Sequence, residues 1–296
     1  MIQLQSFATI AQIQNKPVAS KSNHVVAEWK NQEAVWTIWP SDTAMQAVIT
    51  QAIKALSLEV PVHLILSSDS LRDFALLKLK NDSIAYNRIK IVMNTNAKGF
   101  IRDHGPWFIF DANDQPARLG FKWANYGVTT SLTRNTTIKD SIMMGKFAGE
   151  ITGKMKLKTV VSDLVIENGM IEVNNNGVAI CFMETILQRN PGYDLPAITV
   201  EMKRALGLKK IIWLGSSPSM EKIYPGAKAS NIFGFGGNGH IDQYVRFAND
   251  TTILIAQIDP MERRFDPVTS GDFFILTENL EYLKKLQMKM INHLPS

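Results

Sequence analysis

The sequence has 296 residues, of which 45% are hydrophobic, so the chain is long enough to bury a sizeable core. A single cysteine excludes a disulfide framework and a multi-cysteine metal site, and the five histidines show no spacing typical of a shared metal, so we expect no metal and no cofactor. The net charge of +5 is scattered and no apolar run is long enough to span a membrane, which argues against nucleic-acid and membrane partners and favours a cytoplasmic protein.

No linker divides the chain, so we expect a single domain over residues 1–296, with residues 1–25 as an N-terminal arm packed on the surface or partly mobile. Residues 34–39 are rich in β-branched and aromatic side chains and end at Pro40, which predicts a buried strand. Strands and helices then alternate. The pattern predicts a capped helix after residue 42, a strand at 60–66, a helix at 71–79 and a strand at 89–93.

The stretch from Phe100 to Phe110 places an Arg102-Asp103 pair between an apolar strand and a Gly-Pro turn. Ionised groups where a chain leaves a sheet are typical of site residues in α/β folds. A structural interpretation stays open, because the pair could cap a turn or bind elsewhere. We expect His104 to be a satisfied turn residue rather than a catalyst.

Further along, we expect a strand at 119–126 and a helix at 139–155. An apolar run then ends at Glu167, and the turn at 174–177 predicts a hairpin whose returning strand covers 178–183. Cys181 lies inside that strand, where a lone cysteine is usually an inert small hydrophobe with a raised pKa. The later elements expected are a helix at 196–206, a strand at 210–214, a strand at 252–256 and a helix at 277–290.

The glycines at 234–239 match G-x-G-x-x-G formally, but neither a strand before them nor a helix after them is expected, so we reject a dinucleotide site. We expect instead that these glycines let the backbone approach a ligand beside His240. If residues 238–242 form a strand, His240 and Asp242 point to the same face and place an imidazole beside a carboxylate. Taken alone, such a pair is more often solvated or structural than functional.

Strand, helix and strand recur at regular intervals, which indicates repeated modules without sequence identity between them. Five stretches, in their order along the chain, resemble the agmatine deiminase and bacterial-type peptidylarginine deiminase family: residues 27–40, 101–106, 167–172, 189–191 and 239–242. The resemblance implies a pentein fold, an α/β propeller of five ββαβ modules around a central site. It also implies hydrolysis of an arginine-like guanidinium to a ureido product and ammonia, with a small-molecule or peptide substrate.

The resemblance assigns roles to particular residues. Asp103 and Asp242 are implied to hold the guanidinium nitrogens, Glu167 to be a second acid of the site, and His240 to be the general acid/base. Asn238 and Trp107 are expected to contact the substrate. A guanidinium is planar and permanently charged, so a site must pair its nitrogens with carboxylates and present its central carbon to a thiolate.

The nucleophile of the family is a cysteine near the C-terminus, in a Gly-Gly…His-Cys context that this sequence does not contain. Cys181 does not occupy that place. We therefore expect the last module, with its nucleophile, to be missing. The hypotheses are a guanidine deiminase, a non-catalytic guanidinium-binding homologue, and a truncated inactive homologue; the oligomeric state and the choice among agmatine, arginine and peptidyl-arginine stay open.

Overall fold

The computed structural model describes residues 22–127, 138–219, 227–229, 232–233, 237–262 and 267–291. Most of the arm expected at residues 1–25 therefore lies outside the described residues. Residues 22–25 are packed on the fold, because His24 forms an antiparallel bridge with Phe110 and Val25 is buried. No helix in the described ranges combines the length and apolarity that a membrane span requires.

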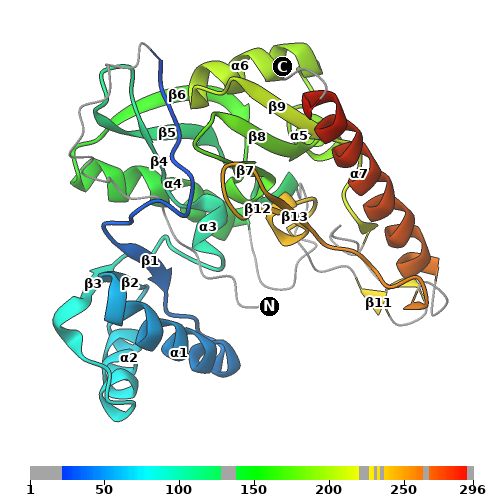
Figure 1. The fold of residues 1–296 in the computed structure, drawn as a ribbon. Coiled ribbons are helices and arrows are strands. Elements are labelled where there is room, and N and C mark those ends of the chain that lie inside the picture. The colour runs from blue at the N-terminus through cyan, green and yellow to red at the C-terminus, as the bar shows by residue number, and fades with distance from the viewer. Residues whose placement is uncertain are drawn as a thin grey trace.

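The first unit is a parallel sheet in the order β1-β2-β3, flanked by two helices and drawn in blue and cyan in Figure 1. The Asp42 side chain accepts a hydrogen bond from the Met45 amide at 2.9 Å, so the first helix begins where its free amides find an acceptor. The elements match those predicted: β1 (Val35–Ile38), α1 (Thr43–Glu59), β2 (Val62–Leu66), α2 (Asp69–Asn81) and β3 (Ile89–Met93).

Two ββαβ modules follow, which confirms the predicted repetition. In each, an antiparallel hairpin is followed by helix, and a third strand then pairs in parallel with the second strand of the hairpin. The first module contains β4 (Trp107–Phe110), β5 (Pro116–Lys122), α4 (Ile138–Lys154) and β6 (Lys158–Val165). The second contains β7 (Ile171–Val173), β8 (Val178–Phe182), α5 (Met183–Arg189), α6 (Leu195–Leu206) and β9 (Lys210–Leu214).

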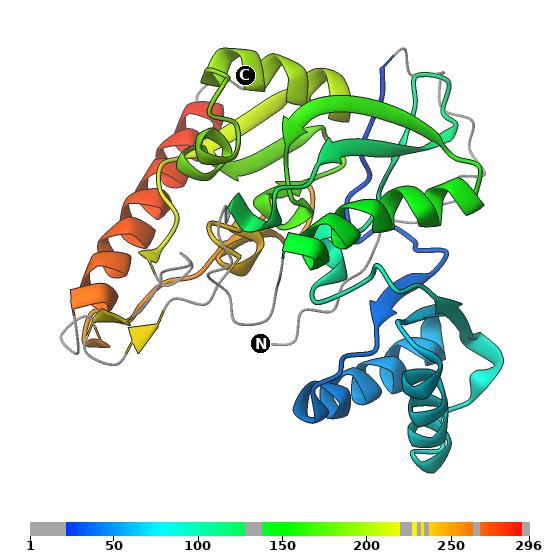
Figure 2. The same ribbon diagram turned by 180° about the vertical axis from the view of Figure 1, so that it is seen from behind.

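A third hairpin, β12 (Val245–Phe247) and β13 (Ile253–Ile255), is followed by the long helix α7 (Pro267–Ile291). Within the described residues no third strand pairs with β13. Figures 1 and 2 show α7, in red and orange, along the side of the molecule away from the first unit. A small hairpin, β10 (Ala227–Ala229) and β11 (Ile232–Phe233), lies near its first turns.

Five expectations about local structure were wrong. The strand expected at 119–126 ends at Lys122, and the 3-10 turn η2 (Asn125–Gly127) follows. Residues 241–243 form the 3-10 turn η5 (Ile241–Gln243) instead of a strand, and the Arg-Asp pair lies in a short helix, α3 (Ile101–His104). The helix α5 was not predicted, and α7 begins ten residues before the predicted start at 277. The segments α3, η5 and α5 are too short to show a hydrophobic period, so their conformation is set by packing.

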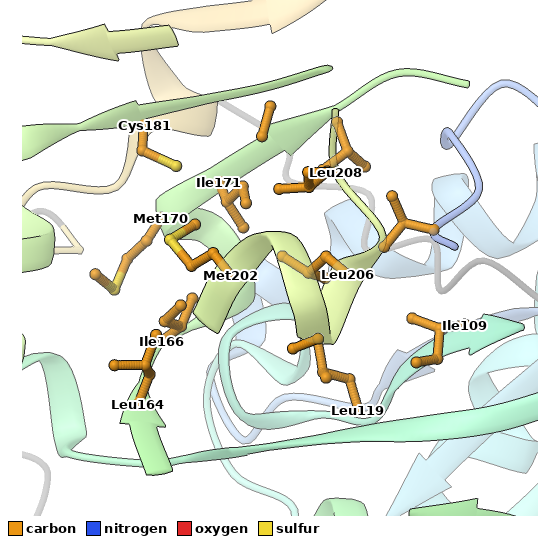
Figure 3. Close-up of a cluster of buried hydrophobic side chains, with 14 of the residues drawn as sticks. Ile109, Leu119, Leu164, Ile166, Met170, Ile171, Cys181, Met202, Leu206 and Leu208 are labelled. Atoms are coloured by element: carbon orange, nitrogen blue, oxygen red, sulfur yellow. The ribbon is translucent and has the colours of Figure 1, made fainter. Parts of the chain in front are cut away.

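The largest group of buried hydrophobic side chains lies between the sheets of the two ββαβ modules and α6 (Figure 3). Cys181 belongs to this core: it is fully buried in β8, opposite Ile171 of β7. Burial raises the pKa of its thiol well above the ordinary value, and the nearby charge of Glu172 adds to the effect. The sequence prediction of an inert, strand-borne cysteine agrees with this position.

Candidate active site

Three short helical turns bring the predicted site residues together. The turns α3, η3 (Asn168–Met170) and η5 each stand directly before the first strand of a hairpin, namely β4, β7 and β12, and they contact one another. Asp103 lies in α3, Glu167 is the residue before η3, and His240 is the residue before η5. Repetition of the module therefore places equivalent segments, far apart in sequence, around one centre.

His240 lies between two carboxylates and is 1% exposed. Its Nδ1 atom is 3.3 Å from Oδ1 of Asp103, and its Nε2 atom is 3.5 Å from Oε2 of Glu167. Burial alone would lower the pKa of the imidazole, but the charge and hydrogen bonding of Asp103, followed by those of Glu167, raise it to about 10. The imidazole is therefore protonated at neutral pH.

Asp103 has a second partner that the sequence did not indicate. The Tyr126 hydroxyl donates a hydrogen bond to its Oδ2 atom at 2.9 Å, and the Tyr126 ring lies 5.5 Å from the His240 ring. Burial opposes ionisation of Asp103, yet His240, Tyr126 and Arg102 hold its pKa below the ordinary value. Tyr126 has a positive φ of 59° in a short turn, so no hydrophobic period or motif marks it.

Glu167 is fully buried against Arg189 at the end of α5. The Nε atom of Arg189 is 3.1 Å from Oε2 and 3.3 Å from Oε1 of Glu167. The Nη2 atom of Arg189 donates to the backbone oxygen of Asn238 at 3.0 Å, which ties Glu167 to the segment that carries His240. Sequence reasoning counted residues 189–191 among the family-like stretches but gave Arg189 no role; a lone arginine at the end of an apolar run was the available signal.

Asp242 is held by Arg102 rather than by His240. Its Oδ2 atom is 2.6 Å from Nε of Arg102, and both side chains are buried. The Oδ1 atom of Asp242 is buried without a hydrogen-bond partner among the described residues. Burial raises the pKa of Asp242 above its ordinary value, and the positive charge of Arg102 only partly offsets this. A buried carboxylate oxygen without a donor is suited to a donor from a ligand.

Behind Asp242, two arginines and two glutamates alternate in a closed charged ring, which comprises Glu28, Arg102, Glu172 and Arg246. The ring lines a cavity of about 330 Å³ whose other walls include the aromatic residues Trp29, Trp107 and Phe247. Burial raises the pKa of Glu172 to about 7, although Arg246 and Arg102 oppose the shift. The Arg246 side chain is 41% exposed, so the ring reaches solvent on that side.

Two glycines allow the close packing of the site. A Cβ atom on Gly169 would lie 2.3 Å from Nδ1 of His240 and 3.0 Å from Oδ1 of Asp103. A Cβ atom on Gly239 would lie 2.1 Å from Oγ1 of Thr185, and Gly239 has a φ of +99°. We expected the glycines at 234–239 to let the backbone approach a ligand. The close neighbour of Gly239 is instead the Thr185 side chain of α5. Residues 234–236 lie outside the described residues.

The two remaining predicted contact residues lie at different places. Asn238 stands beside the cluster, with a φ of 57° and its side-chain amide donating to the backbone oxygen of Tyr126 at 2.7 Å. Trp107 lines the cavity on the far side of Arg102, and its ring packs edge-on against Phe121 at 6.2 Å. No hydrogen bond or ring contact joins Trp107 to His240 within the described part of the chain.

His104, which we expected to have a structural role, is buried next to Asp103. Its Nδ1 atom is 3.0 Å from the Phe100 carbonyl oxygen, and burial lowers its pKa to about 4.

Within the described residues, no group of three or more histidine, cysteine or acidic side chains is arranged to hold a metal ion. The carboxylates around His240 are instead engaged by arginines, a tyrosine hydroxyl and the imidazole itself.

The site and the charged ring together contain five acidic side chains and four basic ones. The acids are Glu28, Asp103, Glu167, Glu172 and Asp242, and the bases are Arg102, Arg189, His240 and Arg246. When all of them are ionised, the negative charges exceed the positive charges by one.

Solved structures with the same arrangement of elements define the class of fold. An agmatine deiminase of C. jejuni, determined as its C315S variant with substrate bound, aligns with a TM-score of 0.69 and 20% identity over 92% of this chain and 74% of that chain. The agmatine deiminase of Enterococcus faecalis aligns with a TM-score of 0.67 and 19% identity over 88% and 68%, respectively. The fold is therefore the pentein α/β propeller, as expected.

The sequence matches the profile of the Porphyromonas-type peptidyl-arginine deiminases over residues 24–290, and the chain belongs to that family. It is 25% identical to the agmatine deiminase of Pseudomonas fluorescens strain SBW25 over 247 residues, which are 80% of this chain and 61% of that protein. It is 27% identical to the agmatine deiminase of Pseudomonas syringae pv. syringae, with 81% and 61% covered. The chain thus spans about three fifths of the length of these relatives.

Proposed function

We propose that this chain forms the guanidinium-binding part of a guanidine deiminase site. The observation that carries the proposal is that Asp103 and Glu167 flank one buried imidazole, while Asp242, which Arg102 holds, has a buried Oδ1 atom without a hydrogen-bond partner among the described residues. A guanidinium nitrogen can donate to that oxygen, and its positive charge is complementary to the carboxylates. A ligand that cannot donate there would leave the buried oxygen unpaired.

The proposed roles follow from the geometry of each side chain. Asp242 offers Oδ1, which is buried without a partner among the described residues, to one guanidinium nitrogen, and Asp103 offers a second carboxylate close to the imidazole. His240 is protonated at neutral pH, so it can donate a proton to the nitrogen that leaves as ammonia. Glu167 keeps the imidazole charged and oriented from its other side. Asn238 and Trp107 are proposed to contact the substrate.

Deimination also needs a nucleophile that attacks the guanidinium carbon. A thiolate would form a covalent thiouronium as ammonia leaves, and water would then give the ureido product and release the thiolate. Cys181 is unsuited to this step, because it is fully buried in the core and its pKa is raised. The printed sequence has no other cysteine. We therefore propose that this chain by itself binds guanidinium compounds without turning them over.

Calorimetry with agmatine, arginine and an arginyl peptide tests the binding. We expect the protein to bind at least one of these guanidinium compounds, and Asp103→Asn to weaken binding by at least about tenfold, because a buried charge pair is lost. Asp111→Asn is the matched control, since Asp111 is as buried as Asp103 but accepts hydrogen bonds only from the β4–β5 turn and Lys158. A folded protein that binds none of the three compounds would refute the proposal.

An ammonia-release assay tests the second part. We expect no ammonia above the uncatalysed background with any of the three compounds. Turnover that disappears in Cys181→Ala would show that the buried thiol becomes accessible, and would replace the binding proposal with a catalytic one. The relatives carry agmatine deiminase in their names and the family carries peptidyl-arginine deiminase, so the relative affinities for agmatine and the peptide decide between these substrate classes.

A further inference from the structure

We propose that Arg102 is a positioning residue of the guanidinium site, which fixes the carboxylate of Asp242 with one oxygen available to the ligand, and that the charged ring in turn fixes Arg102. The inference rests on the proposed function, since it concerns how a guanidinium is held. It assigns a role in recognition to side chains that do not touch the ligand.

The first step of the argument is the reach of Arg102. Its guanidinium contacts three carboxylates from three separate segments: Nε is 2.6 Å from Asp242, Nη2 is 3.4 Å from Glu172, and Nη1 donates to Glu28. The side chain is 8% exposed. A planar group bound on three sides in a buried setting cannot rotate without losing charge-assisted hydrogen bonds, so Arg102 is a rigid support.

The second step is that, among the described residues, Arg102 is the ring member that forms an ion pair with Asp242. Arg246 contacts the same two glutamates, with Nε 2.8 Å from Glu172 and Nη2 donating to Glu28. Among the described residues, however, no ion pair connects Arg246 to Asp242. The two arginines therefore share their partners in the ring and differ in the ion pair with Asp242, so a comparison of the two isolates the effect of that ion pair.

The third step is the orientation of Asp242. A carboxylate can turn about its terminal torsion, and a guanidinium is bound well only when the acceptor oxygen lies near its plane. Because Arg102 binds Oδ2, the other oxygen is directed elsewhere, and that Oδ1 atom is buried without a hydrogen-bond partner in the described part of the chain. Without Arg102, the carboxylate would lose both its fixed orientation and the charge that favours ionisation.

The ionisable groups that act on Asp242 come from five segments. Arg102 and Asp103 belong to α3, His240 precedes η5, and Arg246 belongs to β12. Glu172 of β7 and Tyr126 also face Asp242. Arg102 is the strongest of the groups that lower the pKa of Asp242, after burial has raised it. Binding of a guanidinium should therefore weaken as pH falls through this pKa, and removal of Arg102 should move that weakening to higher pH.

The experiment measures affinity for agmatine or arginine by calorimetry between about pH 4 and 8, a range that begins near the ordinary carboxyl value and includes the ordinary imidazole value. We expect Arg102→Gln to weaken binding at least about tenfold at neutral pH and to shift the pH midpoint upward by about one unit. Arg102→Lys keeps the charge but not the three-sided contact, so it should restore the midpoint while leaving the affinity reduced. Arg246→Gln removes a ring member but keeps the contact between Arg102 and Asp242, so it should weaken binding and shift the midpoint by less than Arg102→Gln does.

Thermal melting of each variant separates folding from positioning. If Arg102→Gln does not fold, Glu28→Gln replaces it, because Glu28 is 31% exposed and its loss removes one anchor of Arg102; we then expect weaker binding with the contact to Asp242 intact. Equal effects of Arg102→Gln and Arg246→Gln, or unchanged affinity in folded Arg102→Lys and Glu28→Gln, would overturn the inference. Absence of binding by the unaltered protein would refute the proposed function instead.

Discussion

At the scale of single residues, the candidate site depends on the absence of a side chain at Gly169. An added Cβ atom would approach His240 Nδ1 to 2.3 Å, a distance that the buried ring cannot accept without moving. We expect Gly169→Ala to weaken guanidinium binding at least about tenfold and to destabilise the protein by about 1–3 kcal/mol, as overpacked cores do. Calorimetry and thermal melting measure the two effects.

Gly271→Ala in α7 is the control for this substitution. Nothing lies within 4 Å of a Cβ atom at Gly271, so the added methyl group meets open space and improves helix propensity. We expect a neutral or slightly stabilising change there, with binding unaltered. Normal binding by Gly169→Ala would contradict the packing of His240 against the η3 turn.

The charge of His240 predicts a loss of stability in alkaline solution. Its pKa is raised from 6.5 to about 10 in the folded state, since Asp103 and Glu167 outweigh the effect of burial. A raised pKa contributes stability that is fully present below pH 6.5 and is lost as pH rises through about 10. We expect the melting temperature to fall over this range, by about 2–4 °C for each kcal/mol lost.

The matched measurement is the same pH series with His240→Gln. That variant cannot lose a proton near pH 10, so its melting temperature should change less between pH 7 and 10 than that of the unaltered protein. His104, the other histidine buried nearby, has a pKa of about 4 and titrates at the opposite end of the scale. Parallel curves for the two proteins would show that His240 is not the group responsible.

The sequence identified the acids and the imidazole of the site but not the residues that support them. Asp103, Glu167, His240 and Asp242 stand in the stretches that resemble the family, and that resemblance, rather than their chemistry alone, implies a guanidinium. Tyr126 and Arg189 act through contacts with residues 23 and 22 positions away, respectively, that no local period encodes. Their roles follow only from the three-dimensional arrangement.

At the scale of elements, the conformation of the site segments could not be predicted. An i, i+2 spacing led us to expect His240 and Asp242 on one face of a strand, whereas the chain forms a 3-10 turn there. The two side chains accordingly have different partners: His240 contacts Asp103, and Asp242 contacts Arg102. The hydrophobic pattern specified the strands β8 and β9 correctly, because burial in a sheet produces a regular signal that a single turn lacks.

Arg189 links the end of α5 to η3 and to the segment before η5. Its side chain is fully buried against Glu167 and also donates to the backbone at Asn238. We expect Arg189→Gln to destabilise the protein by about 3–5 kcal/mol, because it leaves the buried Glu167 carboxylate without its cationic partner. Denaturant unfolding monitored by circular dichroism measures the loss.

Arg204→Gln provides the comparison within α6. Arg204 also pairs with a glutamate, Glu201, at 2.6 Å, but its side chain is 52% exposed, so we expect a loss of only about 0–1 kcal/mol. Similar losses in the two variants would mean that the burial of the Glu167–Arg189 pair does not determine its contribution to stability.

At the scale of the whole molecule, repetition of one module explains both the fold and the site. The turns before β4, β7 and β12 occupy equivalent positions, so side chains more than a hundred residues apart meet at the centre without any local sequence relation. The order of strands and helices predicted this repetition. The family resemblance supplied the propeller arrangement, which periodicity alone does not specify.

The third hairpin leaves one edge of β13 without a neighbour among the described residues. The corresponding strands β5 and β8 are each paired on both sides, whereas β13 pairs only with β12, and Leu254 at its centre is 57% exposed. Exposed apolar edge strands promote pairing between molecules, and a lysine on the edge suppresses it. We expect Leu254→Lys to reduce concentration-dependent self-association of the protein, measured by sedimentation velocity and light scattering, while changing stability by less than about 0.5 kcal/mol.

Val200→Lys is the control. Val200 is an apolar residue that is 69% exposed, but it lies on the helix α6 instead of a strand edge, so the substitution should leave association unchanged. A protein that stays monodisperse at all concentrations, or an equal effect of the two lysines, would show that the β13 edge is not the surface through which molecules associate.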